Sequence, residues 1–404
     1  MKIAEPAYLR LVPNVTANRT VYDLVIATFS SVPFTVDHVQ YVPDVGRHLD
    51  DPANWSPRLI TNRPHFPNEV NIVPDDVFQQ PGVLSVASGF FSPTKTHGSV
   101  DLLQGWAKQE VSPVTISSQA SGEEWFYHRV EWADMNGDGR KDAITARANF
   151  NPLDQLGVEA SSKSQLVWFE QPSSYPALSP SWNGHVISDC ADLFFRSANL
   201  IVGGKNKTVI FSAGYFSKKL CVTWTEDQNG DWSDETKVRT KTIDDELGVY
   251  FSVEVADMNS DSKLDLLVTV NSPDNGTVLV YEIPDDVTKG PWERRVISDG
   301  FSVPGLFKQG KGSPGFAVPF YPFVANSTGK PSILVSGYDD GHAYILSPAS
   351  QSPTDWRYER TSFHAGHGVI GNGFQLGDVD GDGTQELFLP CYSEGQVLVY
   401  QVIP

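Results

Sequence analysis

The stretch Asp134-Met135-Asn136-Gly137-Asp138-Gly139-Arg140-Lys141-Asp142 has two further copies in the chain, at residues 257–265 and 378–386. Each copy places oxygen-bearing side chains at positions 1, 3, 5 and 9 and a backbone carbonyl at position 7, a donor set that suits a hard cation such as calcium. Position 6 is glycine in the first and third copies, because the chain must bend sharply there, and Ser262 in the second. The predicted calcium ligands are Asp134, Asn136, Asp138, Arg140 and Asp142; Asp257, Asn259, Asp261, Lys263 and Asp265; and Asp378, Asp380, Asp382, Thr384 and Glu386.

An EF-hand is the main alternative for such a loop, and the sequence argues against it. An EF-hand needs a bidentate Glu at position 12 and flanking helices, whereas position 12 is Thr145, Val268 and Leu389 in the three copies. A short apolar run follows each loop, which is typical of a buried strand. We therefore predict strand–turn–strand connections, with acidic turns that bind no metal as the remaining alternative.

The spacing of the three turns reveals a smaller repeat. The turns start at residues 134, 257 and 378, intervals of 123 and 121 residues, and each interval holds two units marked by a tryptophan before branched apolar residues. Trp182 and Trp292 are such markers and are expected to pack between units. Seven buried second strands are predicted, at residues 23–28, 83–88, 142–147, 208–213, 265–270, 332–337 and 386–391.

Each unit is consistent with four antiparallel strands that need neighbouring units to cover their faces. The sequence therefore predicts an all-β fold, a single seven-bladed β-propeller domain over residues 1–404 with calcium turns in three blades. We expect residues 7–12 to add a strand to the C-terminal blade and residues 300–315 to form a long loop. Two separate β domains are the alternative.

The turn and the strand after it resemble the FG-GAP/VCBS repeat of integrin-α-type propellers. With the tryptophan-marked strand added, the unit is similar to that in the propeller of fungal aldos-2-ulose dehydratase. This resemblance implies a propeller scaffold with metal in three blades. It also implies a dehydratase-like activity, in which a proton next to a carbonyl is removed while water leaves.

Composition limits the partners and cofactors. A formal net charge of −19 argues against a nucleic acid or an anionic membrane as partner. No dinucleotide or phosphate-binding fingerprint is present, so calcium is the expected cofactor and no organic cofactor is expected. The chain has no apolar run long enough for a transmembrane helix. The oligomeric state stays open.

The predicted location is the cytoplasm. The N-terminus lacks the apolar core of a signal peptide. Cys190, Cys221 and Cys391 match no zinc or redox pattern and are expected to be reduced thiols. Six N-x-S/T sequons leave secretion open if a leader was removed.

The candidate site lies in the loops that lead into the first strand of each blade. They carry four of the nine histidines, and histidine suits acid/base chemistry near neutral pH. Converging imidazoles could alternatively hold a transition metal. Each histidine could also have a structural role, in which it caps a turn or forms a hydrogen bond to a neighbouring blade. The candidate catalytic residues are His65, His128, His364, His367 and Arg196, and the candidate substrate-binding residues are Trp125, Phe194, Tyr250, Phe251 and Phe301.

Two classes of function follow. The first is a lyase of secondary metabolism, a carbon–oxygen dehydratase acting on a small polyoxygenated, aromatic or terpenoid substrate in the central channel. A quinone methide-like product could then be guided into a cyclisation or a hetero-Diels–Alder reaction. The second is a calcium-stabilised carbohydrate-binding or integrin-like interaction propeller. The histidines and the arginine are not repeated in register from blade to blade, and this favours one central site over repeated lectin pockets.

Overall fold

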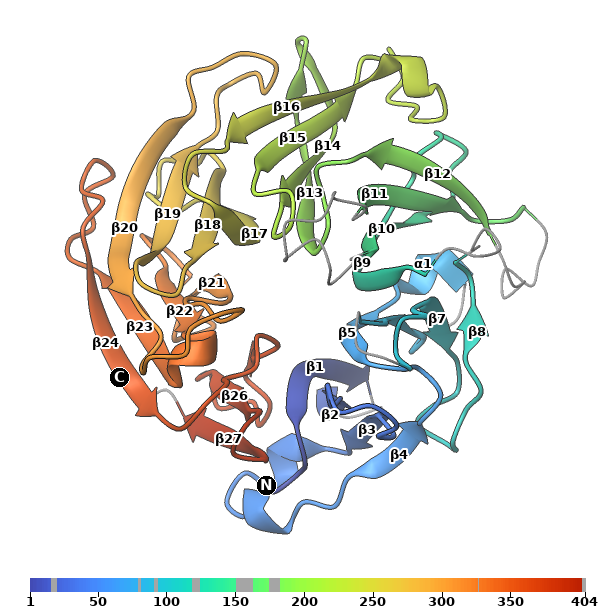
Figure 1. Cartoon of the computed structure of the whole chain (residues 1–404), viewed down its shortest axis with the longest axis vertical. Coiled ribbons are helices and arrows are strands. Elements are labelled where there is room, and N and C mark those ends of the chain that lie inside the picture. The colour runs from blue at the N-terminus through green and yellow to red at the C-terminus, as the bar shows by residue number, and fades with distance from the viewer. Residues whose placement is uncertain are drawn as a thin grey trace. The chain divides into compact units, whose positions relative to one another are not determined.

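The computed structural model describes residues 1–15, 20–78, 81–90, 94–117, 124–149, 163–173, 182–325 and 327–401. Its strands form seven antiparallel sheets, six of four strands and one of three, which follow one another along the chain (Figure 1). This arrangement confirms the predicted fold class, an all-β propeller of seven blades. The chain divides into two compact units, Met1–Leu193 with Asp227–Val238 and Phe194–Glu226 with Arg239–Pro404.

The first unit contains three blades. Blade 1 consists of β1 (Pro6–Val15), β2 (Thr20–Thr28), β3 (His38–Val42) and β4 (Arg58–Thr61). Blade 2 consists of β5 (Pro67–Ile72), β6 (Leu84–Ser88), β7 (Val100–Leu103) and β8 (Val114–Thr115), with the short helix α1 (Asp75–Phe78) between its first two strands. Blade 3 consists of β9 (Phe126–Ala133), β10 (Asp142–Asn149), β11 (Lys163–Glu170) and β12 (Asn183–Ser188).

The second unit contains four blades. Blade 4 consists of β13 (Phe194–Val202), β14 (Lys205–Ala213), β15 (Leu220–Thr225) and β16 (Val238–Asp244), and blade 5 of β17 (Val249–Ala256), β18 (Asp265–Asn271), β19 (Gly276–Glu282) and β20 (Glu293–Phe301). Blade 6 consists of β21 (Ala317–Phe320), β22 (Ser332–Ser336), β23 (His342–Pro348) and β24 (Tyr358–Ala365). Blade 7 has three described strands, β25 (Gln375–Gly377), β26 (Glu386–Cys391) and β27 (Gln396–Gln401).

The seven predicted buried strands are confirmed as the second strands β2, β6, β10, β14, β18, β22 and β26. Every residue of β18 and of β26 is buried. Such strands read as unbroken apolar runs because both of their faces are covered. The long loop predicted at residues 300–315 is also present between β20 and β21.

The role predicted for residues 7–12 is wrong. These residues belong to β1, which pairs antiparallel with β2 from Pro6 opposite Thr28 to Val15 opposite Thr20. The two strands are neighbours in the chain, and pairing neighbours costs less loop-closure entropy than pairing the two chain ends.

Within each unit, neighbouring blades pack through their first strands and through large apolar side chains. In the first unit β1 contacts β5, and β5 contacts β9; in the second, β13 contacts β17, and β17 contacts β21. Trp182 of blade 3 packs edge-on against Phe78 of blade 2 with ring centroids 6.3 Å apart. Trp292 of blade 5 packs against Phe211 of blade 4 at 6.0 Å. Both tryptophans therefore lie between blades, as predicted.

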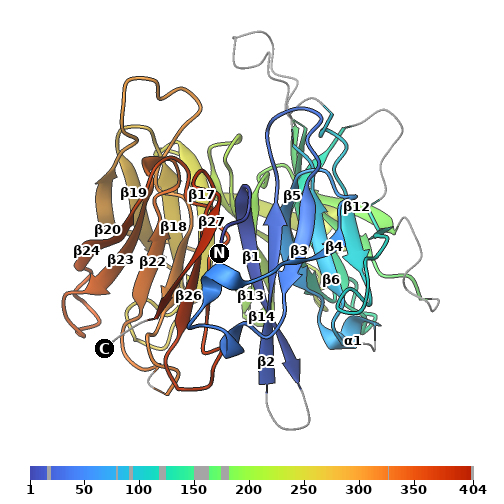
Figure 2. The ribbon, with the colours of Figure 1, turned by 90° about the horizontal axis from the view of Figure 1, so that it is seen from below.

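The antiparallel order of a blade separates its two ends. In blade 5 the turn between β17 and β18 lies at one end, whereas the approach to β17 and the β18–β19 hairpin lie at the other (Figure 2). Phe251 and Asp257 are six residues apart on the same extended segment, so they are separated by about 20 Å. A predicted calcium turn is thus remote from the aromatic residues at the start of the same strand.

Two cysteines differ from the sequence-based expectation. Cys190 and Cys221 are disulfide-bonded, so the prediction that they are reduced thiols is wrong. Cys391 is a buried free thiol. Widely spaced cysteines carry no local signal of pairing, because only the folded chain brings their Cβ atoms within reach.

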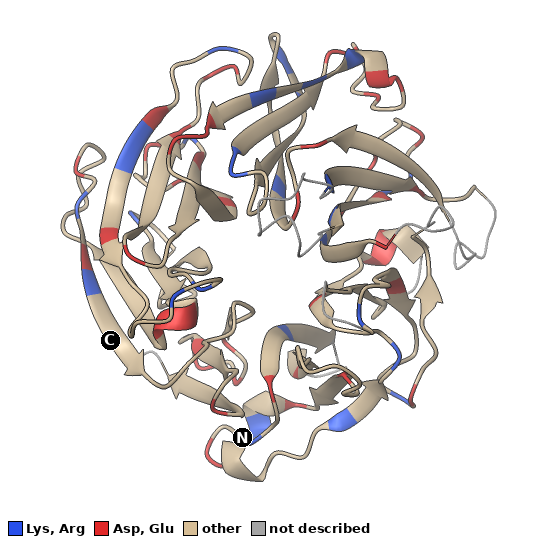
Figure 3. Cartoon of the chain, in the orientation of Figure 1, with Lys and Arg blue, Asp and Glu red and all other residues tan. Residues whose placement is uncertain are grey.

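The charged side chains lie mostly in turns and on outer strands such as β16, β20 and β24 (Figure 3). Among the described helices, none is long and apolar enough to cross a membrane.

A buried ion pair fixes the loop between β2 and β3 to blade 2. Lys95 Nζ donates to both carboxylate oxygens of Asp37 at 2.7 Å, to the Ser30 carbonyl at 2.7 Å and to Thr35 Oγ1 at 2.9 Å. Both charged side chains are only 1% exposed. Asp37 also accepts from the backbone N–H groups of Ser30 and Phe66, so it links two blades through one carboxylate.

We expect Lys95→Met to destabilise the protein by about 3–5 kcal/mol, because the substitution leaves the Asp37 charge buried without its cation. Denaturant unfolding would measure the change. The exposed pair of Lys141 and Asp76 provides the control, and Lys141→Met should cost less than about 1 kcal/mol. Equal effects of the two substitutions would contradict this role of the buried pair.

Candidate functional site

The three acidic turns share one hydrogen-bond pattern. The position-1 aspartate accepts from the backbone N–H groups at positions 4 and 6, which are Gly137 and Gly139, Ser260 and Ser262, and Gly381 and Gly383. The position-9 carboxylate accepts from the position-2 N–H at 2.9 Å in the first turn, 3.0 Å in the second and 3.1 Å in the third. The sequence pattern therefore encodes one backbone shape three times.

The serines of the second turn do not change this shape. Ser260 and Ser262 have φ values of 64° and 68°, whereas the corresponding glycines of the third turn have 82° and 91°. A residue with a Cβ pays a steric cost in this left-handed region. The second turn accepts that strain and keeps the same contacts.

The third turn shows the clearest gap for a cation. One oxygen each from Asp378, Asp380 and Asp382 lies within 4.8 Å of the other two. Glu386 is 1% exposed, and its Oε1 has no hydrogen-bond partner among the described residues. The pKa of Glu386 is raised to about 7, chiefly by burial and in part by the negative charges of the three aspartates. In the first turn, by contrast, the Arg140 guanidinium already contacts Asp138.

The candidate residues in the first unit have three different environments. His65 is exposed ahead of β5. Trp125 is 1% exposed, lies in the core between blades 2 and 3, and carries the Arg147 guanidinium over its ring at 4.2 Å. His128 lies on β9, where burial lowers its pKa to about 3 and the neighbouring Arg129 charge adds to that shift. A histidine this hard to protonate is a poor general base at neutral pH.

In the second unit, three of the candidate residues serve packing or pairing. The Arg196 guanidinium binds Glu254 through two hydrogen bonds of 2.6 and 2.7 Å between β13 and β17. Tyr250 has no exposed surface and donates to Asp244 at 2.5 Å. Phe301 is 1% exposed and lies 4.3 Å beneath the Arg360 guanidinium. These environments favour structural roles over the predicted contacts with a substrate.

Phe194 and Phe251, by contrast, are brought together. Phe316 packs edge-on against Phe194 with centroids 4.3 Å apart, and Phe251 lies 5.8 Å from Phe194. Tyr338 and Tyr215 extend this aromatic group at 5.3 and 5.9 Å from Phe251. The group gathers at the approaches to β13, β17 and β21 and at two hairpins, which all lie at the same end of the blades in this unit.

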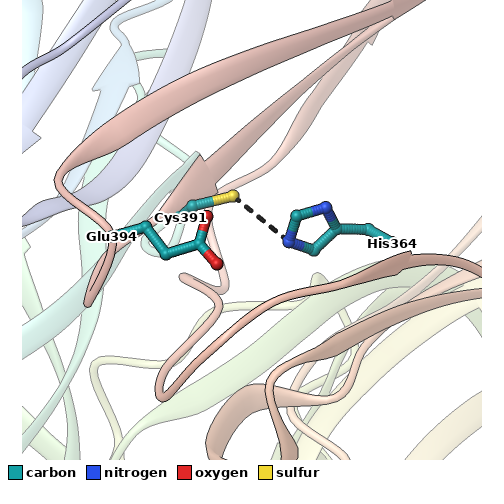
Figure 4. A group of neighbouring side chains, drawn as sticks. All are labelled: His364, Cys391 and Glu394. Carbon is teal, nitrogen blue, oxygen red and sulfur yellow. Dashed lines mark hydrogen bonds between the residues drawn. The ribbon is translucent and has the colours of Figure 1, made fainter.

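His364 is the centre of a second cluster at that end. It lies on β24, and its Nδ1 is 2.9 Å from the Tyr400 hydroxyl of β27. Its Nε2 is 3.8 Å from Cys391 Sγ at the end of β26. The Glu394 carboxylate, from the turn after β26, faces the same two atoms (Figure 4). We call His364, Cys391, Glu394 and Tyr400 the His364 cluster.

Gly366 makes the close approach in this cluster possible. A Cβ on this residue would lie 2.2 Å from Glu394 Oε1 and 2.7 Å from His364 Nε2. The Gly366 N–H donates to the Gly341 carbonyl, and the Gly341 N–H donates to the Tyr338 carbonyl. This chain of backbone contacts connects the His364 cluster with the aromatic group.

Burial and hydrogen bonding shift the pKa values of His364, Cys391 and Glu394 in different directions. Partial burial lowers the pKa of His364, and the Glu394 charge opposes that shift. Burial raises the pKa of Cys391 to about 12, so its thiol stays protonated at neutral pH. Glu394 accepts the backbone N–H of His367 at 2.9 Å, and this hydrogen bond lowers its pKa. The His367 side chain is exposed, so it lies beside the cluster and contributes its backbone.

Sequence reasoning selected His364 and missed its three partners. Cys391, Glu394 and Tyr400 are 27 to 36 residues away in the chain and reach His364 only because blade 7 packs on blade 6. His342 also lies near enough to lower the pKa of His364. A search for acid and thiol residues at the ends of neighbouring second strands could have found Cys391 and Glu394.

Comparison with solved structures finds distant similarities. No family model matches the chain, and no curated protein matches it. A structure described as the Dos1 propeller is 14% identical, with 94% of this chain and 75% of that chain covered and a TM-score of 0.48. A puromycin-hydrolysing peptidase of Mycobacterium tuberculosis is 10% identical over 98% of this chain and 56% of its own, with a TM-score of 0.46.

A rhamnogalacturonan lyase of Bacillus licheniformis is 11% identical over 100% of this chain and 70% of its own, with a TM-score of 0.37. Proteins this distant do not indicate a shared activity. The functional argument therefore rests on the residues themselves.

The environment of His128 leads to a pH-dependent prediction. Its pKa is about 3 in the fold and 6.5 in an unfolded chain, so between these values the unfolded chain binds more protons. Stability should then fall as the pH decreases from about 6.5, by up to about 1.4 kcal/mol per pH unit for this group. In His128→Gln the loss between pH 6.5 and 4.5 should be smaller by about 1–2 kcal/mol.

Denaturant unfolding at the two pH values would measure this difference. His97→Ala is the control, because its ring is 72% exposed. An unchanged pH dependence in His128→Gln would show that His128 is protonated as easily in the fold as in the unfolded chain.

Proposed function

We propose that this protein is a lyase-type enzyme that uses His364 as a general base at the His364 cluster. The observation that carries the proposal is the pair of contacts on one imidazole, with Tyr400 at Nδ1 and a half-buried Nε2 facing a carboxylate. If Nδ1–H donates to the Tyr400 oxygen, the lone pair of Nε2 is free to accept a proton. A base whose orientation is set by another group is a recurring arrangement in enzymes that move protons.

The neighbouring groups have separate roles in this proposal. Glu394 stabilises the imidazolium that forms, since it remains ionised close to the ring. Cys391 is not the nucleophile, because a thiol with a pKa of about 12 holds its proton. Nε2 takes the proton from the carbon next to the carbonyl, and the electron pair of that C–H bond forms a carbon–carbon double bond as the bond from the adjacent carbon to its hydroxyl breaks. The imidazolium returns the proton to the departing oxygen, which leaves as water.

The aromatic group indicates the kind of substrate. Phe194, Phe251 and Phe316 pack together at the same end of the unit as His364 and are 8%, 4% and 6% exposed. The small apolar surface that they leave open suits an aromatic ring or the apolar face of a sugar. A small polyoxygenated carbonyl compound matches both the base and this wall. The resemblance of the repeat to the propeller of aldos-2-ulose dehydratase supports the same class of reaction.

A calcium-dependent carbohydrate-binding function is the second candidate, and one observation favours it. A cavity of about 520 Å³ adjoins the second acidic turn and is lined by Asp261, Lys263, Asp265 and Glu282, among others. A calcium ion in that turn would face the cavity, and calcium accepts oxygen ligands such as sugar hydroxyls. This candidate predicts calcium-dependent retention on a glycan surface and no chemical turnover.

We further propose that calcium fills the three turns and serves stability. The third turn fits the ion, since one oxygen each from Asp378, Asp380 and Asp382 lies within 4.8 Å of the other two and Glu386 Oε1 has no partner among the described residues. The first two turns share its backbone hydrogen bonds. The third turn precedes the start of β26, whereas Cys391 lies at the end of that strand and Glu394 in the turn after it, so calcium would act on the scaffold.

Removal of calcium should lower the melting temperature. At a calcium concentration a hundredfold above Kd, one site contributes about 2.7 kcal/mol. Differential scanning fluorimetry with EGTA, then with calcium restored, would measure the shift. Glu386→Gln should reduce the calcium-dependent part, whereas Glu359→Gln on the exposed face of β24 should not. A melting temperature that is indifferent to EGTA would exclude the calcium sites.

Substitution of His364 should reduce the proposed reaction. The assay uses a panel of β-hydroxy carbonyl compounds, with excess calcium and no zinc, and follows the ultraviolet absorption of the unsaturated carbonyl product. His364→Ala should lower the rate by about 10²–10⁴-fold, since this is the usual contribution of a general base. His97→Ala should have no effect. Full activity of His364→Ala would remove this residue from the mechanism, and no reaction with any panel member would remove the substrate class.

A further inference from the structure

We propose that His364 Nε2, Cys391 Sγ and the Glu394 carboxylate form a binding site for one divalent transition metal of the zinc type. The three donor atoms lie within 4.8 Å of one another and come from β24, from β26 and from the turn after β26. The inference does not need the proposed function, because metal binding can be measured without a substrate.

The spacing of the donors fits tetrahedral zinc. Zinc bonds of about 2.0 Å to nitrogen and 2.3 Å to sulfur, meeting at a tetrahedral angle, separate the two donors by about 3.5 Å. The Nε2–Sγ distance here is 3.8 Å. This is long for a hydrogen bond, and a movement of a few tenths of an ångström would suffice for both atoms to bind the same ion.

The donor chemistry selects the metal. A thiolate with an imidazole favours zinc and similar ions, whereas calcium and magnesium prefer oxygen donors alone. Binding converts the Cys391 thiol to a thiolate, and its proton passes to solvent. The negative thiolate and Glu394 then neutralise the charge of the ion.

Surrounding residues hold the donors in place. Tyr400 occupies Nδ1 at 2.9 Å, and this outer contact fixes the ring so that Nε2 points to the ion. Gly366 keeps the space between Nε2 and Glu394 clear, since a Cβ there would approach both within 2.7 Å. Three protein ligands would leave the fourth position for water or another small ligand, as in catalytic zinc sites.

The two uses of Nε2 exclude one another. A nitrogen lone pair that binds zinc cannot accept a proton, so zinc should suppress any reaction that needs His364 as a base. The protein would then have one imidazole that responds both to a substrate and to the supply of a metal.

Cobalt is the probe for the experiment, because its bond to a thiolate absorbs in the near ultraviolet. The full chain is freed of metals, given excess calcium to fill the acidic turns, and titrated with CoCl2 and then with ZnCl2. We expect saturation at one cobalt per chain, a thiolate–cobalt charge-transfer band, and loss of that band as zinc replaces cobalt.

Variants assign the ligands. Cys391→Ser should abolish the band, and His364→Ala and Glu394→Gln should each weaken cobalt binding by at least about tenfold. Circular dichroism confirms folding, and if the buried Cys391→Ser does not fold, the other two variants decide the outcome. His97→Ala should bind as the unaltered chain does. Absence of the band in the unaltered chain, or a cobalt affinity in His364→Ala and Glu394→Gln equal to that of the unaltered chain, would overturn the proposal.

Discussion

The second strand of every blade must be covered on both faces, and no blade can cover it alone. β18 and β26 are buried along their whole length, so their apolar side chains need layers on either side. This requirement explains why Trp182 and Trp292 lie between blades and why the first strands touch in succession in blades 1 to 3 and in blades 4 to 6. It also fixes where the blade ends lie. The acidic turns and the residues around His364 are found at those ends.

Much of the fold was predictable because its signals are local and repeated. The three acidic turns gave the period, and the apolar runs after them gave the second strands, since both depend on residues close together in sequence. The role of residues 7–12 was not predictable in this way. The apolar alternation of these residues shows that the strand needs a partner. It does not show whether that partner is β2 or a strand of the C-terminal blade, and the structure pairs it with β2.

The candidate site was predictable only in part, for the same reason. His364 and the phenylalanines at the strand approaches could be selected by position, because each blade repeats the same order of elements. Arg196 and Tyr250 looked equally suitable, yet each is engaged with a carboxylate. Glu254, the partner of Arg196, is brought close only by folding, whereas Asp244, the partner of Tyr250, lies six residues before it. Cys391, Glu394 and Tyr400 were missed because nothing in their own neighbourhood marks them as partners of a histidine in the preceding blade.

The left-handed serines of the second turn have a broader consequence. Ser260 and Ser262 keep the same aspartate contacts that glycines make in the other two turns. The carboxylate at position 1, by gathering the backbone N–H groups around itself, is therefore enough to impose the curvature, and glycine only makes it easier. Searches for relatives that insist on glycine at these points would overlook blades of this type, whereas searches that weigh the spacing of the acidic residues would find them.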